Sequence, residues 1–197
     1  LRLLHPFTQL IHLFTGIKQR LLVFLGLAVH GLAVDGFVFA QVLHLAYSAA
    51  TTCSYHSSEL AIESKPYAKN VRLVDTKHVS VGQCAVVVAV AQWLKEHPEA
   101  TLDQAAEMAE TIGLQTKMCF VPKNLDYLRA GGRVSNVAAL TGNLLQLHPC
   151  IEIIDGRLMA KKKYRGAMEK FLPKLLRDFD EKHHLGREQL YLICTPY

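Results

Sequence analysis

Apolar and polar positions from residue 41 onward switch between strand-like and helix-like spacing. Short apolar runs predict strands at 41–47, 71–74, 116–121 and 190–194. Longer stretches with apolar residues three or four positions apart predict helices at 52–63, 81–95, 101–112, 135–145 and 167–182. Strands that alternate with helices in this way are typical of α/β proteins, so this is the predicted fold class.

Local signals sharpen some of these boundaries. Thr101 followed by Gln104 has the spacing of a capping box at the start of a helix. Asp155-Gly156, between two apolar runs at 150–154 and 157–163, predicts a tight hairpin, so the second sheet is not purely parallel. Pro173, inside the helix predicted at 167–182, is expected to kink or restart that helix.

The first 40 residues are apolar and carry few charges. The run 21–34 is shorter than the roughly 18–20 residues that a membrane-spanning helix needs, so no membrane span is predicted. We leave 1–40 as an atypical apolar segment without an assigned domain. The remaining chain is predicted to form a partial first lobe at 41–80 and a second lobe at 81–197.

Composition excludes several chemistries. The net charge of +5 favours anionic ligands without indicating nucleic acid by itself. The five cysteines are scattered and form no C-x-x-C pair, which favours reduced thiols in the cytoplasm. The ten histidines form no H-E-x-x-H pattern, and no P-loop or G-x-G-x-x-G occurs. No metal and no cofactor are therefore predicted.

The segment 125–136 holds the first candidate site. A short amphipathic helix at 125–130 runs into Gly131, which suits the left-handed position that ends a helix, and Gly132, which allows a second turn. Arg133 would then be held by a stiff double turn and could fork onto a carboxylate or phosphate. The alternative is an ordinary corner between two helices with a solvated arginine.

Thr52-Cys53-Ser54 forms the second candidate, at a junction between a strand and a helix. Backbone N–H groups and the helix dipole favour an anion there, and the hydroxyls of Thr52 and Ser54 add donors. The alternative is simple capping of the helix by Thr51 or Thr52.

The run Lys161-Lys162-Lys163-Tyr164-Arg165 is the third candidate. Basic residues beside a tyrosine are compatible with contact to a nucleic-acid backbone. The alternative is an exposed edge strand whose lysines block unwanted strand pairing.

Five motifs in order give the chain a family resemblance. The run Leu-x-Tyr-Leu-x-x-Gly-Gly-Arg-Val-Ser at 125–135 resembles the signature of the DegV family of bacterial fatty-acid-binding proteins. Four further segments resemble the same family: the strand ending in Asp-Thr at 71–77, the helix start at 79–82, the hairpin strand at 147–156, and the arginine–glycine entry to the next helix at 164–166. The resemblance covers about residues 42–195.

The resemblance implies a two-lobed fold of the EDD type. The first lobe has a parallel sheet, and the second lobe has a mixed sheet with helices. The family's opening Asp-Ser strand, its Thr-Ser-x-Pro-Ser motif and its late histidine do not occur here. The chain is therefore expected to be incomplete at both ends, with the second lobe truncated at its C-terminus.

The resemblance also implies a function. The chain would bind a long-chain fatty acid, with its carboxylate at Thr52, Ser54 and Arg133 and its tail in the second lobe. A separate ATP-dependent kinase subunit, docked at Arg165, would phosphorylate that carboxylate, so the chain would not be an enzyme alone. The expected location is the cytoplasm, with transient contact to a membrane surface and no nucleic-acid partner.

Two other functional classes stay open on the residues alone. One is a hydrolase or transferase that uses Thr52 or Ser54 as nucleophile with His56 or His78 as base. The other is a nucleic-acid-binding module that uses the basic run at 161–165.

Overall fold

The computed structural model describes residues 41–63, 65–123, 125, 128, 130–132, 147–186 and 189–192, and the backbone of strand β1 (Leu21–Leu25). Two compact units make up the chain: unit 1, Leu1–Thr116, and unit 2, Lys117–Tyr197. This division lies well beyond the expected boundary at 80/81. It does so because the two helices after residue 80 pack against the sheet that precedes them.

Unit 1 is built on a parallel sheet. Strands β1, β2 (Gln41–Ala46) and β3 (Val71–Asp75) lie in the order β1-β2-β3, with Leu45 of β2 opposite Val74 of β3. Strand β1 was not predicted from the sequence, because its continuous apolar run was compared only with membrane-spanning segments. Such runs are typical of parallel strands, which are buried on both faces.

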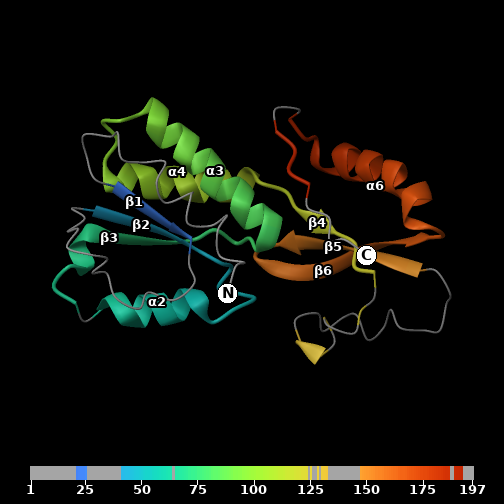
Figure 1. Cartoon of the computed structure of the whole chain (residues 1–197), viewed down its shortest axis with the longest axis horizontal. Coiled ribbons are helices and arrows are strands. Elements are labelled where there is room, and N and C mark those ends of the chain that lie inside the picture. Colours follow the sequence, from blue (N-terminus) through green and yellow to red (C-terminus); the bar gives the residue numbers. More distant parts are fainter. Residues whose placement is uncertain are drawn as a thin grey trace, which may run out of the picture. The chain divides into compact units, whose positions relative to one another are not determined.

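Helices cover both faces of this sheet (Figure 1). Helices α3 (Ser80–Glu96) and α4 (Leu102–Gln115) lie on one face, and α2 (Ser54–Glu63) lies on the other. The core of unit 1 lies between the sheet and the α3/α4 pair and contains Leu43, Leu45, Val74, Val86, Val90, Leu94, Leu102, Ala105 and Ala109. A short 3-10 helix, η2 (Ala68–Asn70), leads into β3.

Helix α4 begins and ends at defined contacts. The predicted capping box is confirmed, because Thr101 accepts a hydrogen bond from the Gln104 backbone while the Gln104 side chain accepts one from Thr101. Near the other end, Gly113 packs directly on the backbone that follows β3. A Cβ at this position would lie 2.9 Å from the Thr76 carbonyl oxygen.

We predict that Gly113→Ala destabilises unit 1. The clash with backbone should cost about 1–3 kcal/mol, which outweighs the roughly 1 kcal/mol that alanine gains over glycine inside a helix. Urea unfolding measures the loss of free energy. Gln115→Ala, an exposed change in the same helix, serves as the control and should stay within about 0.5 kcal/mol of the wild type. Equal stability of both variants would show that the helix can move away from Thr76.

In the part of unit 2 that the structure describes, a helix covers an antiparallel sheet. Strands β4 (Cys119–Phe120), β5 (Leu147–Ile154) and β6 (Arg157–Arg165) lie in that order, and α6 (Met168–His183) packs on them. The predicted hairpin is confirmed: Asp155 (φ 48°) and Gly156 (φ 77°) both adopt the positive φ of a type I′ turn. The packed face brings together Cys150, Tyr164, Phe171 and Leu175.

Three predictions in unit 2 differ from the structure. Strand β4 covers only two residues of the predicted 116–121 and stops before Pro122, which cannot donate to a sheet. Pro173 does not divide α6, because it lies on the exposed face between turns anchored by buried apolar residues. The described part of the last predicted strand, 190–192, forms no strand, and its leucines are 78% exposed.

Some predictions fall outside the described residues, including the helix at 135–145. Within the described helices, none is both long and apolar enough to span a membrane.

Candidate anion-binding site

The loop that follows β2 turns back on one buried residue, Ser48. The Ser48 N–H donates to the His78 carbonyl oxygen at 3.0 Å, and the Ser48 carbonyl oxygen accepts from the N–H groups of Thr51 and Thr52 at 3.1 Å each. The Thr51 hydroxyl donates to the same carbonyl at 3.1 Å. The loop is therefore held by its own backbone at the carboxyl end of a parallel strand, where open α/β sheets bind ligands.

Thr52 links this loop to α2. Its hydroxyl oxygen accepts a hydrogen bond from the Ser54 N–H at 3.0 Å, so it caps the helix as the alternative interpretation expected. The Cys53 carbonyl then accepts from Ser57 and begins the helical hydrogen-bonding pattern. Among the described residues, no acceptor takes the Thr52 hydroxyl proton. This half-buried hydroxyl can therefore cap the helix and still donate to an anion.

Ser54 is the first residue of α2. Its carbonyl oxygen accepts from the Ser58 hydroxyl at 2.9 Å, which ties together the first turn. The first N–H groups of a helix have no partner within the helix and carry its positive dipole end. The Thr52–Ser54 junction thus combines a hydroxyl donor with an electropositive helix terminus.

Asp75, at the end of β3, holds two loops together. Its Oδ1 accepts from the Ala49 N–H at 3.2 Å in the loop after β2 and from the Lys77 N–H at 2.9 Å in the loop after β3. Lys77 adopts φ 57°, a left-handed conformation that costs a non-glycine residue about 1 kcal/mol. The carboxylate compensates for this cost by binding the Lys77 N–H.

Buried polar side chains continue the connection into α3. The Thr76 hydroxyl lies 2.8 Å from the Ala46 carbonyl oxygen and also contacts Oε1 of Gln83. The Gln83 amide donates to the Leu45 carbonyl at 2.9 Å. Both side chains are almost fully buried, so these bonds fix the ends of β2 and β3 against the first turn of α3.

The structure gives no support to a nucleophile paired with a histidine. Nδ1 of His56 lies 3.4 Å from a Glu59 carboxylate oxygen, and Nε2 of His78 lies 3.0 Å from the Gly113 carbonyl oxygen. No hydrogen bond among the described residues joins Thr52 or Ser54 to a histidine side chain. The described part of the chain also holds no group of three or more histidine, cysteine or acidic residues that could bind a metal.

Of the two arginines predicted to be functional, only Arg165 lies among the described residues. Gly131 and Gly132 form a turn, but the left-handed residue is Gly132 (φ 63°) and not Gly131 as expected. The turn thus reaches the left-handed conformation one residue later. Arg133 lies outside the described residues, so its relation to Thr52 stays a prediction. Arg165 is exposed at the end of β6.

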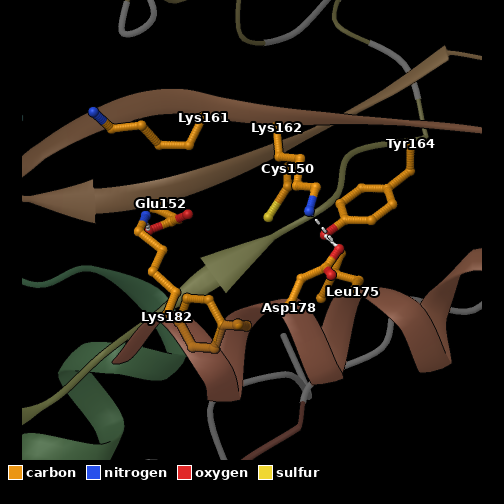
Figure 2. Close-up of a pocket in the computed structure, with 9 residues that line it drawn as sticks. Cys150, Glu152, Lys161, Lys162, Tyr164, Leu175, Asp178 and Lys182 are labelled. Carbon is orange, nitrogen blue, oxygen red and sulfur yellow. Dashed lines mark hydrogen bonds and ion pairs between the residues drawn. The ribbon is translucent and has the colours of Figure 1, made fainter. Parts of the chain in front are cut away.

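Two groups of charged residues border a cavity of about 430 Å³ between β5, β6 and α6 in unit 2 (Figure 2). At one end the buried Glu152 carboxylate accepts from Nζ of Lys182 at 2.6 Å and contacts Nε2 of His183 at 3.0 Å. At the other end Asp178 accepts from the Tyr164 hydroxyl at 2.8 Å and pairs with Lys162 at 2.7 Å. These contacts hold α6 on the sheet.

Hydrogen bonds set the protonation of the Asp178 group. The hydrogen bond from Lys162, followed by that from Tyr164, holds the pKa of Asp178 well below its usual range. Burial, together with the hydrogen bond to Asp178, raises the pKa of Tyr164. The carboxylate is therefore charged and the phenol protonated at neutral pH.

We predict that the contribution of Asp178 to stability disappears in acid. Because the folded-state pKa is below the unfolded value of about 3.9, the stabilisation is complete above that value and is lost as pH falls below it. Asp178→Asn should lower the Tm at pH 7, and the difference from wild type should shrink as pH falls below about 4. Asp180→Asn, on the same helix, is the control. A Tm difference that stays constant down to pH 2 would contradict the ion-pair explanation.

We predict that Asp75→Ala loosens the loop that carries Thr52. Two backbone N–H groups lose a charged acceptor, which should cost about 1–3 kcal/mol of stability. Hydrogen exchange should accelerate at the amides of Ala49 and Lys77. Asp75→Asn keeps an oxygen at this position and should preserve most of their protection. Unchanged exchange in Asp75→Ala would mean that the loops hold their shape without the carboxylate.

Comparison with known proteins decides the family. The family model described as "Uncharacterised protein, DegV family" matches residues 38–195. The chain belongs to the DegV family. A DegV domain-containing protein of Clostridium perfringens is 31% identical over 78% of this chain and 53% of its own length. A protein of Thermotoga maritima named "Fatty acid-binding protein" is 33% identical over 71% of this chain and 49% of its own length.

Solved structures agree with this assignment. The structure titled "Fatty Acid Binding of a DegV family Protein from Thermus thermophilus" is 27% identical, has a TM-score of 0.61, and covers 73% of this chain and 50% of that one. The α/β fold with one parallel and one antiparallel sheet is therefore a DegV fold. This chain spans about half the length of the relatives that it matches.

Proposed function

We propose that this DegV chain binds a long-chain fatty acid and contributes the Thr52 junction to the carboxylate site. The observation that carries the proposal is the Thr52 hydroxyl. It is fixed by the Ser54 N–H, and among the described residues its own proton has no acceptor. It lies at the N-terminal end of α2, beyond the carboxyl end of a parallel strand. A carboxylate suits this combination of donor and dipole.

The relatives support the chemical class of the ligand. One sequence relative and one solved DegV structure carry fatty acid binding in their names. Neither name refers to a catalysed reaction. We therefore propose a binding protein that holds its ligand for another protein to use.

The apolar tail and the carboxylate of the ligand contribute differently to the free energy of binding. A saturated tail of about 15 methylenes gains roughly 0.8 kcal/mol each on burial, or about 12 kcal/mol in total. Association costs on the order of 4–15 kcal/mol. The tail mostly offsets that cost, and the carboxylate contacts of Thr52, Ser54 and Arg133 decide the affinity. We propose that the tail enters an apolar site in the second lobe, apart from the charged cavity of Figure 2.

We predict that Thr52→Ala weakens palmitate or oleate binding by about 1–3 kcal/mol, since the carboxylate loses a hydroxyl donor. Isothermal titration measures the change, and Thr52→Ser should restore affinity. Thr51→Ala is a matched control, because the neighbouring Thr51 hydroxyl proton already serves the Ser48 carbonyl. Equal weakening in both variants would indicate a general loop effect, and unchanged affinity in Thr52→Ala would place the carboxylate elsewhere.

We further propose that a separate ATP-dependent kinase subunit, in the cytoplasm, uses the bound ligand. Its reaction would transfer the terminal phosphoryl group of ATP to the fatty-acid carboxylate and give an acyl phosphate. Arg133 would orient the carboxylate with its guanidinium fork. Arg165, exposed at the end of β6, would meet the kinase.

We predict that Arg165→Ala leaves fatty-acid affinity unchanged and slows acyl-phosphate formation with the kinase subunit. Charges at the rim of an interface act mainly on the association rate and its salt dependence. Turnover as a function of ionic strength, with lipid affinity measured in parallel, tests this. Lys163→Ala, another exposed cation on the same strand, is the control. Loss of lipid without any change in turnover at saturation would place Arg165 at the ligand instead.

A further inference from the structure

Unit 2 holds a pair of thiols that the proposed function does not use. Cys119 lies on β4 and Cys150 on the neighbouring β5. Cys119 is paired with Glu152, two residues beyond Cys150, so the two cysteines are diagonal neighbours on one face of the sheet. Both belong to the cluster that packs under α6, and both are free thiols.

The register brings this diagonal close together. The Ile153 N–H donates to the Met118 carbonyl at 3.3 Å, which makes that pair hydrogen-bonded and the Cys119 pair the next, non-hydrogen-bonded one. At a non-hydrogen-bonded pair such as Cys119 and Glu152, the side chains on the shared face lie close to those of the neighbouring strand. Cys119 and Cys150 therefore lie on one face of adjacent strands and in the same packed cluster.

The two sulfurs differ in character. A hydrogen bond with Cys150 lowers the pKa of Cys119 against the opposing effects of burial and of the Glu152 carboxylate, and Lys182 adds a smaller lowering. The same hydrogen bond raises the pKa of Cys150, which keeps its proton. Cys119 is half-buried, whereas Cys150 is fully buried. A more acidic, more accessible thiol beside a protonated one has the arrangement of an attacking and a resolving cysteine.

The two thiols differ in their access to solvent: Cys119 is only half-buried, and Cys150 borders a cavity. Cys150 lines the cavity of about 430 Å³ between the β5/β6 hairpin and α6, and Figure 2 shows its sulfur between Glu152 and Tyr164. Lys161, Lys162 and Lys182 line the same cavity. Hydrogen peroxide is little larger than water, so a cavity of this size admits it.

We propose that Cys119 and Cys150 form a peroxide-sensitive dithiol. The Cys119 thiolate attacks one peroxide oxygen, the O–O bond breaks, and a hydroxide leaves and is protonated to water, which gives a sulfenic acid on Cys119. The Cys150 sulfur then attacks the Cys119 sulfur, the S–O bond breaks, and the hydroxide leaves as water with the Cys150 proton. Two thiols are oxidised to one disulfide while one peroxide is reduced to two waters.

This disulfide would be reversible rather than structural. Diagonal neighbours have Cα atoms about 7–8 Å apart, beyond the usual range for a disulfide, so closing the bond requires a strand to shift. β4 pairs over only two residues, so few ladder hydrogen bonds oppose such a shift. Strained disulfides are the readily reduced ones, so dithiothreitol should restore both thiols quickly.

Peptide mapping of the folded chain tests the proposal. After one equivalent of hydrogen peroxide, alkylation and trypsin without reduction, peptide 118–123 should be found linked to peptide 134–157. Cys150→Ser should stop the reaction at a sulfenic acid on Cys119, which dimedone labels. Cys84→Ser removes an exposed thiol that lies outside the pair and should keep the full yield of linked peptide.

Three results would overturn the proposal. One is a link that forms only in urea, and another is the absence of any dimedone label on Cys119 in Cys150→Ser that circular dichroism shows to be folded. The third is oxidation of the exposed Cys53 and Cys84 while Cys119 and Cys150 both stay reduced. The wild-type link requires no substitution, so a variant that fails to fold does not decide the outcome.

Discussion

The geometry of unit 1 depends on the need to satisfy buried polar groups where β2 and β3 end. Thr76 and Gln83 lie in the core, and each has a partner on the strand ends: Ala46 for the hydroxyl and Leu45 for the amide. A buried donor or acceptor without a partner costs about 1–3 kcal/mol. These hydrogen bonds therefore fix how the strand ends meet the first turn of α3. The loop with Thr52 is attached to this fixed frame through Asp75 and Ser48.

Unit 2 is held together differently, because helix α6 is mostly solvent-exposed. Only Phe171 and Leu175 of α6 are fully buried. Two carboxylates, Glu152 from the sheet and Asp178 from the helix, join α6 to the hairpin on the two sides of the cavity. The carboxylates are mostly covered while their lysine partners are about half exposed. The ion pairs therefore help to fix how α6 lies on the sheet.

Local signals allowed most elements to be predicted from the sequence. The Thr101 capping box and the Asp155-Gly156 turn are short-range chemistry, and both appear as expected. The predictions that differ depend on partners distant in sequence. β1 is a strand because β2 lies beside it, and the unit boundary follows α3 and α4 onto the sheet. For the site, the sequence indicated Thr52 and its hydroxyl, but Asp75 was seen only as part of a motif. Its role could not be predicted, because it depends on Ala49 and Lys77, which are distant from each other in sequence, both lying beside its carboxylate.

The contacts that position Thr52 all lie within unit 1. Its hydroxyl is fixed by Ser54, its backbone by Ser48, and the loop by Asp75 of β3. None of these contacts needs a residue beyond Thr116, although the chain spans only half of the relatives that it matches. A pre-formed donor lowers the ordering cost that binding must overcome. The contribution of Thr52 can therefore be tested separately, while total affinity also depends on Arg133 and on the tail site. For this reason the difference in fatty-acid affinity between the Thr51→Ala and Thr52→Ala variants is more informative than the absolute Kd of either.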